Sequence, residues 1–310
     1  MRCSHIFLTV VFTFISFIQG FSQSFEVNEV KVNKYVIGDF YQPQEKSTKL
    51  AIIVGGSGDI NRNGNQSMIK TDAYKKLASH LANNGIACFT YDKRVLRMND
   101  LAFTESDLRF EDYVTDVRSV VKHFKETNDH DDITLIGHSQ GSLVSLIAAQ
   151  EIGDAVISIA GAGESINHIL YDQLKKQLPQ SEKALRKALD SLKIKGEVKD
   201  YPPQLFSVFR PQVQPFLHSW MQYDPQELIA QLDLPVLIIN GDQDLQVDVD
   251  QAKKLKAAQP KAELVIIENM NHILKESKAK DLANQQTYQK PELPLVDELK
   301  KEILRFINDL

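Results

Sequence analysis

The sequence predicts an α/β fold, in which helices cover both faces of a mostly parallel β-sheet. The first observation behind this prediction is a set of short apolar runs without polar alternation, as strands buried on both faces require. The second is that helix-like segments separate these runs, which is the spacing of a parallel sheet with crossover helices. The runs are residues 50–56, 86–92, 131–137, 155–161, 234–240 and 262–268.

The segments around these runs complete the predicted fold. Residues 25–42 alternate like two half-buried strands joined near Asn33. A helix over 106–127 is predicted to start at Ser106, because its apolar side chains then form one stripe. Glycines cap two further helices, at Gly85 and Gly153. The remaining predicted helices are 72–84, 142–152, 248–258 and 295–309.

Composition limits the class of protein. The chain has 310 residues, of which 43% are hydrophobic and 25% charged, and its net charge is −5. This length suits one large α/β domain with an insertion, or two small domains. Acidic and basic residues are interspersed, so the sequence lacks the clustered basic face expected of a nucleic-acid-binding protein.

Residues 1–23 differ from the rest of the chain. One arginine, an apolar run and then small and polar residues form the pattern of a secretory signal peptide, with cleavage expected after Ser22. The run is short for a permanent membrane anchor, although an uncleaved anchor stays an alternative. The sequence therefore predicts a secreted or periplasmic protein. Its mature part would keep only Cys88, which we expect to be a buried apolar residue.

Residues 164–230 interrupt the strand–helix alternation. Two helix-like segments, 165–178 and 181–194, precede a proline-rich stretch that cannot serve as a central strand. We interpret 164–230 as a helical cap inserted between the two parts of the core, 24–163 and 231–310. Its aromatic residues either line a substrate pocket or form the core of the cap itself: Phe206, Phe209, Phe216, Trp220 and Tyr223.

The strongest chemical signal is Gly137-His138-Ser139-Gln140-Gly141. It lies between a predicted buried strand and a helix, where a serine nucleophile needs a tight turn that exposes its hydroxyl. Flanking glycines leave room for the neighbouring backbone. A glycine-rich connection without chemistry is the alternative, but the strand–turn–helix context favours Ser139 as a nucleophile.

A serine nucleophile needs a base, and the base needs an orienting acid. In this kind of fold the order is Ser, Asp, His, with each residue just beyond a strand. Asp244 and His272 follow the runs 234–240 and 262–268 and are the predicted acid and base. Asp242 is the alternative acid, and it would otherwise stabilise its own turn.

The negative charge that develops on the substrate requires two backbone N–H donors. One is expected from Gln140, directly after the nucleophile. The other is expected from Ser57 in the glycine-rich loop after the first buried run, with Gly56 as the alternative. This loop lacks the Gly-Lys-Ser/Thr ending of a phosphate-binding P-loop.

These segments together resemble the α/β-hydrolase superfamily, in particular bacterial secreted or periplasmic esterases with a helical cap. The resemblance extends from about residue 25 to the end of the chain. It departs from the family at Gly55-Gly56, where relatives usually have His-Gly, and at Val95, where they carry glycine. The matching segments are GGSGDINRNGN, YDKR, ESDLRFEDYVTDV, GHSQGS, FRPQVQPFLHSWMQYDP, NGDQDLQV and MNH.

The resemblance implies hydrolysis of a small-molecule carboxylic ester through an acyl-enzyme, with no cofactor and no metal. Three alternatives remain open on the same fold. The triad could cleave peptides or amides, it could serve a thioesterase or acyltransferase, or the chain could be a non-catalytic binding protein. The oligomeric state is not predicted.

Overall fold

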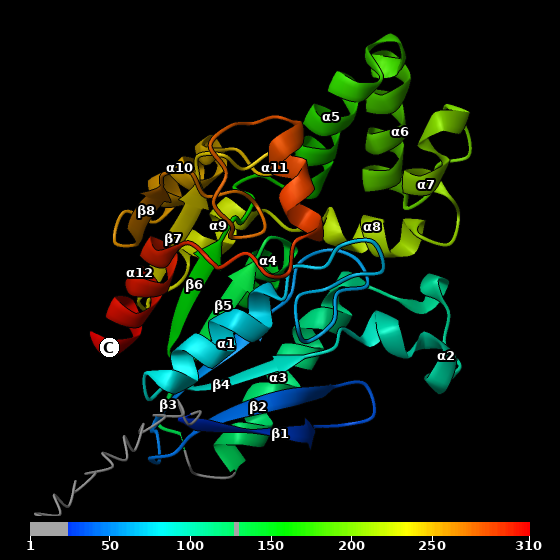
Figure 1. Ribbon diagram of the computed structural model, residues 1–310. Coiled ribbons are helices and arrows are strands. Elements are labelled where there is room, and N and C mark those ends of the chain that lie inside the picture. Colours follow the sequence, from blue (N-terminus) through cyan, green and yellow to red (C-terminus); the bar gives the residue numbers. More distant parts are fainter. Residues whose placement is uncertain (1–23, 127–129) are drawn as a thin grey trace, which may run out of the picture.

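The computed structural model describes residues 24–126 and 130–310, and the signal peptide predicted over 1–23 lies outside them (Figure 1). An eight-stranded sheet has the order β1-β2-β4-β3-β5-β6-β7-β8. β1 and β2 form an antiparallel hairpin, and β2 pairs antiparallel with β4, whereas all other neighbours are parallel. The strands are β1 Phe25–Lys31, β2 Ile37–Pro43, β3 Lys49–Val54, β4 Ala87–Tyr91, β5 Asp132–His138, β6 Ala155–Ile159, β7 Val236–Gly241 and β8 Glu263–Ile267.

Two helical layers cover the sheet. Helices α1 (Ala73–Asn83) and α12 (Asp297–Asn308) pack on one face. The other face carries α3 (Phe110–Glu126), α4 (Gln140–Ala148) and α10 (Val249–Ala258). Helices α1, α3, α10 and α12 each bury one face, and α4 is buried along its whole length. The central strands are buried on both faces, so the sheet is the middle of a three-layer core. The predicted α/β architecture, a mostly parallel sheet with helices on both faces, is confirmed.

Helices between β6 and β7 stand over one end of the sheet (Figure 1). α5 (Ile166–Gln177) and α6 (Glu182–Lys195) lie side by side and confirm the two helices predicted there. Their buried residues form an apolar cluster of their own, separate from the two clusters on the sheet. The shorter helices of this region are α7 Phe206–Phe209, α8 Gln214–Trp220 and α9 Pro225–Ala230.

Two predictions about local structure were wrong. The helix α3 begins at Phe110 rather than at Ser106, because Thr104 caps a separate 3-10 turn, Glu105–Asp107, and the chain then extends at Leu108. The run 262–268 is not buried on both faces. It forms β8 at the sheet edge, where only Ile267 is fully buried.

Several short elements were not predicted: α2 Met98–Leu101, α11 Leu282–Gln286 and 3-10 turns at Arg94–Arg97, Pro179–Ser181, Pro203–Leu205 and Thr287–Gln289. Cys88 is fully buried in β4, as expected, and burial raises the pKa of its thiol above the ordinary value. Among the residues described, no helix is both long and apolar enough to cross a membrane.

Candidate active site

Ser139 occupies a strained turn between β5 and α4. Its backbone has φ 54° and ψ −118°, a conformation that side chains other than glycine rarely adopt. The turn is tight enough that a Cβ on Gly141 would lie 2.1 Å from the carbonyl oxygen of Val54, and one on Gly137 would lie 2.3 Å from that of Gly141. The two flanking glycines are therefore required for the close approach of three backbone segments, which presents Ser139 at the end of the sheet.

Asp244 and His272 meet beyond the carboxyl ends of β7 and β8. Oδ2 of Asp244 lies 2.7 Å from Nδ1 of His272, and both side chains are buried. Oδ1 accepts the backbone N–H groups of Gln246 and Val247 at 2.7 and 2.9 Å. Burial raises the pKa of Asp244, but His272 and the two amides lower it more. The pKa of this carboxyl therefore stays below its ordinary value.

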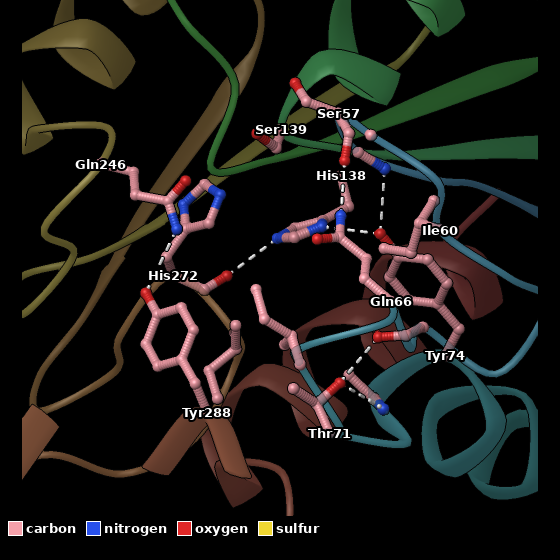
Figure 2. Close-up of a pocket in the computed structure, with 16 residues that line it drawn as sticks. Ser57, Ile60, Gln66, Thr71, Tyr74, His138, Ser139, Gln246, His272 and Tyr288 are labelled. Carbon is pink, nitrogen blue, oxygen red and sulfur yellow. Dashed lines mark hydrogen bonds between the residues drawn. The ribbon is translucent and has the colours of Figure 1, made fainter. Parts of the chain in front are cut away.

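The hydrogen bond to Asp244 sets the tautomer of His272. A carboxylate only accepts, so Nδ1 carries the proton and Nε2 is left as the basic nitrogen. His272 and Ser139 line the same cavity (Figure 2). Across the described chain their side chains make no direct hydrogen bond. Such catalytic contacts often tighten only when substrate is bound.

Asp242 has a different partner from Asp244. Its Oδ1 accepts the backbone N–H of Asn269 at 2.7 Å, which ties the loop after β7 to the loop after β8. The structure thus brings Asp244, and not Asp242, into contact with the base.

The loop after β3 supplies one candidate amide for the developing negative charge. The N–H of Gly56 donates to the Tyr74 hydroxyl at 3.0 Å, so this amide already has a partner. Ser57 follows it and lines the cavities on both sides of Ser139. The second candidate, Gln140, is the first residue of α4, where backbone N–H groups have no partner within the helix.

His138, next to Ser139, connects Tyr74 to the loop that carries His272. Its Nδ1 lies 2.8 Å from the Tyr74 hydroxyl, and its Nε2 lies 2.8 Å from the carbonyl oxygen of His272 (Figure 2). The carbonyl requires Nε2 to donate, so Nδ1 accepts from Tyr74. Burial, together with nearby His272, lowers the pKa of His138 to about 3. His138 is thus a neutral link between the oxyanion loop and the base.

Two cavities meet at Ser139, Ser57 and Gln246. We call the first, of about 270 Å³, the His272 cavity; besides His272 itself its walls include Ile60, Ile69, Tyr74, His138, Ile273 and Tyr288. We call the second, of about 320 Å³, the cap cavity; its walls include Leu143, Ile166, Ile169, Leu170, Trp220 and Pro225. Both walls are mainly apolar, which suits an organic substrate.

Of the five cap aromatics proposed for a substrate pocket, only Trp220 lines a cavity at Ser139. Phe209 is fully buried in the cap cluster, and Phe206 is 57% exposed. Phe216 and Tyr223 pack around Phe110 of α3, with ring centroids 6.2 and 5.6 Å away. Phe209 thus packs inside the cap, and Phe216 and Tyr223 fix the cap to the core, because α8 lies against α3.

Several residues of the site were missed by sequence reasoning. Gln246 and Tyr288 line the His272 cavity, and their side chains are 3.3 Å apart. Tyr288 lies in the 3-10 turn Thr287–Gln289, whose sequence carries no periodic signal. Lys93 is buried beside the oxyanion loop, and the position of a lysine directly after a buried strand was the signal available for it. In the described residues, no group of three or more His, Cys, Asp or Glu side chains could hold a metal ion.

Known structures share this architecture. Est1E from Butyrivibrio proteoclasticus superposes with a TM-score of 0.56 at 16% identity, covering 91% of this chain and 99% of that one. The Pyrococcus furiosus esterase Pf2001 gives 0.56 at 16% identity, covering 92% and 90%. At this level of identity the likeness shows the fold alone.

Sequence comparison identifies the family. Esterase EstD of Thermotoga maritima is 26% identical over 261 residues, which are 81% of this chain and 61% of that protein. This chain thus spans less than two thirds of the length of EstD. The profile of the serine aminopeptidase (S33) family of hydrolases matches residues 69–278, more than half of the chain and including Ser139, Asp244 and His272. The chain belongs to this serine aminopeptidase (S33) family of α/β-hydrolases.

Proposed function

We propose that this protein hydrolyses carboxylic esters through an acyl-enzyme, with Ser139 as nucleophile, His272 as base and Asp244 as orienting acid. One observation carries the proposal: His272, held by Asp244 at 2.7 Å, lines the same cavity as the strained Ser139. Family membership and the likeness to EstD support it.

In the proposed mechanism, the Ser139 hydroxyl attacks the ester carbonyl carbon while Nε2 of His272 takes its proton. The N–H groups of Ser57 and Gln140 stabilise the oxyanion. When the tetrahedral intermediate breaks down, His272 returns the proton to the leaving alcohol oxygen. Water then attacks the acyl-enzyme by the same route and releases the acid.

The two cavities assign the two parts of the substrate. His272 must protonate the leaving oxygen, so the alcohol part belongs in the His272 cavity. The acyl part then belongs in the cap cavity, which Gln140 lines and His272 does not. Both cavities exceed the roughly 150 Å³ that holds a benzene molecule in a protein core. We therefore propose esters with an apolar acyl group and an apolar alcohol, each up to about ring size.

The charges around the cavities favour an ester over an aminopeptidase substrate. A free amino terminus would need a carboxylate partner, and among residues 24–126 and 130–310 only one acidic residue, Glu164, lines either cavity. Its Oε2 already accepts from Gln251 and from the Lys254 ammonium. Because Lys254 neutralises Glu164, this carboxylate is a weak receptor for a second cation.

The test compares p-nitrophenyl esters with aminoacyl p-nitroanilides on the wild-type protein and on Ser139→Ala. We expect ester hydrolysis by the wild type and a loss of about 10⁴-fold or more in kcat in the variant. If the protein cleaves the nitroanilides efficiently and this cleavage also depends on Ser139, the proposed triad stands but the substrate is an amide and not an ester. Equal ester rates in the two proteins would contradict the proposal.

We also propose that the protein is exported, on the basis of the signal-peptide pattern in residues 1–23. N-terminal sequencing of protein purified from the producing cells and from their medium tests this. A mature chain beginning at Gln23 is expected, and an exported or cytoplasmic product that retains Met1 would contradict the proposed cleavage.

A further inference from the structure

Lys93 lies two residues after the end of β4 and is only 4% exposed. Its Nζ donates to the carbonyl oxygen of Gly56 and to the side-chain oxygen Oε1 of Gln140, each at 2.7 Å. The ring of Tyr113 lies beneath the ammonium, with its centroid 4.1 Å from Nζ. Among the described residues no carboxylate lies within ion-pair distance of Lys93, so neutral oxygens bind this buried amine.

The first of these bonds determines where the Ser57 amide points. The carbonyl of Gly56 and the N–H of Ser57 belong to the same peptide unit, and the described chain contains no cis peptide bond. In a trans peptide the C=O and N–H point in opposite directions. Because Lys93 holds the carbonyl on the buried side, the N–H of Ser57 is turned away from Lys93, towards the cavities that Ser57 lines.

The second hydrogen bond of Nζ connects Lys93 to Gln140, the residue with the other candidate oxyanion donor. Gln140 carries the second N–H proposed to bind the oxyanion, and its side chain is fixed by the same Nζ. The backbone N–H of Lys93 also donates to the carbonyl of Ile60, at 3.3 Å, in the loop that carries Ser57. One residue therefore contacts both segments that are expected to form the oxyanion hole.

We propose that Lys93 is a positioning residue that aligns the Ser57 and Gln140 amides into one oxyanion hole. This inference rests on the acyl transfer proposed above. Lys93 acts through the two amides and is not itself in contact with substrate.

The role does not depend on the charge of Lys93. Burial lowers the pKa of Lys93 to about 7, although Asp116 and Asp59 raise it in part. An ammonium has three N–H donors and a neutral amine has two. Both oxygens can therefore stay hydrogen-bonded in either protonation state, and an apolar replacement removes both bonds at once.

The test is Lys93→Met, which keeps the length of the side chain and removes its donors. Lys49→Met is the matched control, because Nζ of Lys49 also binds backbone carbonyls, those of Ile307 and Asn308, far from Ser139. We expect Lys93→Met to lower kcat for ester hydrolysis by about 10²- to 10³-fold, the effect of losing an oxyanion donor, with KM nearly unchanged. Lys49→Met should keep the wild-type kcat.

A second readout separates alignment from general damage. A trifluoromethyl ketone, which forms a tetrahedral adduct with a serine, should lose affinity for Lys93→Met by the same factor as kcat/KM. The product acid, which carries no tetrahedral oxyanion, should bind as tightly as to the wild type. Equal weakening of both ligands, or a kcat within threefold of the wild type, would overturn the role of Lys93.

If Lys93→Met does not fold, Gln140→Leu decides the question, because it removes one of the two oxygens that bind Nζ. The proposal expects about a tenfold loss in kcat and in ketone affinity, with unchanged binding of the product acid; a wild-type kcat would refute it. These outcomes differ from failure of the proposed function, in which the wild-type protein itself would hydrolyse no ester.

Discussion

Asp244 binds His272 with one carboxylate oxygen and its own loop with the other. Oδ2 lies 2.7 Å from Nδ1 of His272, while Oδ1 accepts the amides of Gln246 and Val247. These three hydrogen bonds tie the carboxylate both to His272 and to the backbone of the loop that carries Asp244. The loop geometry and the tautomer of the base thus depend on the same side chain.

Replacement of this carboxylate should abolish most of the activity without unfolding the protein. In Asp244→Asn an amide can turn its N–H₂ towards Nδ1, which favours the wrong tautomer of His272 and leaves Nε2 protonated. We expect kcat for a p-nitrophenyl ester to fall by about 10⁴-fold. Asp242→Asn is the control, because asparagine can still accept from Asn269, and its kcat should stay within a few-fold of the wild type. Similar losses in both variants would show that Asp244 has no special role.

His138 should make the protein acid-sensitive. The pKa of this histidine is lowered to about 3 in the folded state, against about 6.5 when unfolded. As pH falls below about 6.5, the unfolded chain binds a proton that the folded protein does not. The free energy of unfolding should then decrease by up to about 1.4 kcal/mol per pH unit, and this loss should continue towards pH 3.

The matched variant for this prediction is His138→Gln, whose amide can accept from Tyr74 and donate to the carbonyl of His272 without titrating. Urea unfolding at pH 7, 6, 5 and 4 measures the effect. The stability of the wild type should decline more steeply than that of the variant. Parallel declines would mean that His138 is protonated in the folded protein.

The cap cavity should limit the size of the acyl group, and the His272 cavity should limit the size of the alcohol. Leu170→Trp narrows the cap cavity, and Ile69→Trp narrows the His272 cavity. The first should lower kcat/KM for p-nitrophenyl hexanoate at least about tenfold relative to the acetate. The second should instead lower kcat/KM for naphthyl acetate relative to methyl acetate.

The two tryptophan variants act as controls for one another, since each adds the same side chain to a cavity that Ser139 lines. If both variants change acyl preference alike, the assignment of acyl group to cap cavity is wrong. If Leu170→Trp changes the alcohol preference and Ile69→Trp changes the acyl preference, the alcohol part occupies the cap cavity.

Because the backbone of Ser139 is strained, a substitution that relieves this strain should stabilise the protein. Ser139→Ala and Ser139→Gly both lack the nucleophile, but only glycine adopts φ 54° and ψ −118° without a Cβ penalty. Relief of about 1–3 kcal/mol of strain exceeds the entropy cost of glycine. Ser139→Gly should unfold at a higher urea concentration than Ser139→Ala. The reverse order would show that the turn is unstrained.

The proposed catalytic residues could be predicted from the sequence because they follow strands whose ends meet in the fold. Ser139, Asp244 and His272 each follow an apolar run that forms a strand, and parallel strands place their carboxyl ends at one edge of the sheet. The run lengths and the intervening helices were therefore enough to predict both the sheet and the residues at its edge.

The walls of the site could not be found in the same way. Tyr288 reaches the His272 cavity from a segment without helical or strand periodicity. The cap aromatics are apolar in sequence whether they face substrate or protein, and Phe216 packs on Phe110 only because α8 lies against α3. Lys93 has no pattern that reveals its contacts, since its two acceptors are distant in the sequence, Gly56 in the loop after β3 and Gln140 at the start of α4.

Covalent labelling with a fluorophosphonate, followed by peptide mapping by mass spectrometry, tests the central claim most directly. A serine activated by His272 reacts with this probe, whereas an ordinary surface serine does not. We predict a single adduct on Ser139 in the wild type and none in Ser139→Ala or His272→Ala. An adduct on another residue, or equal labelling of the wild type and Ser139→Ala, would contradict the assignment of Ser139 as the nucleophile.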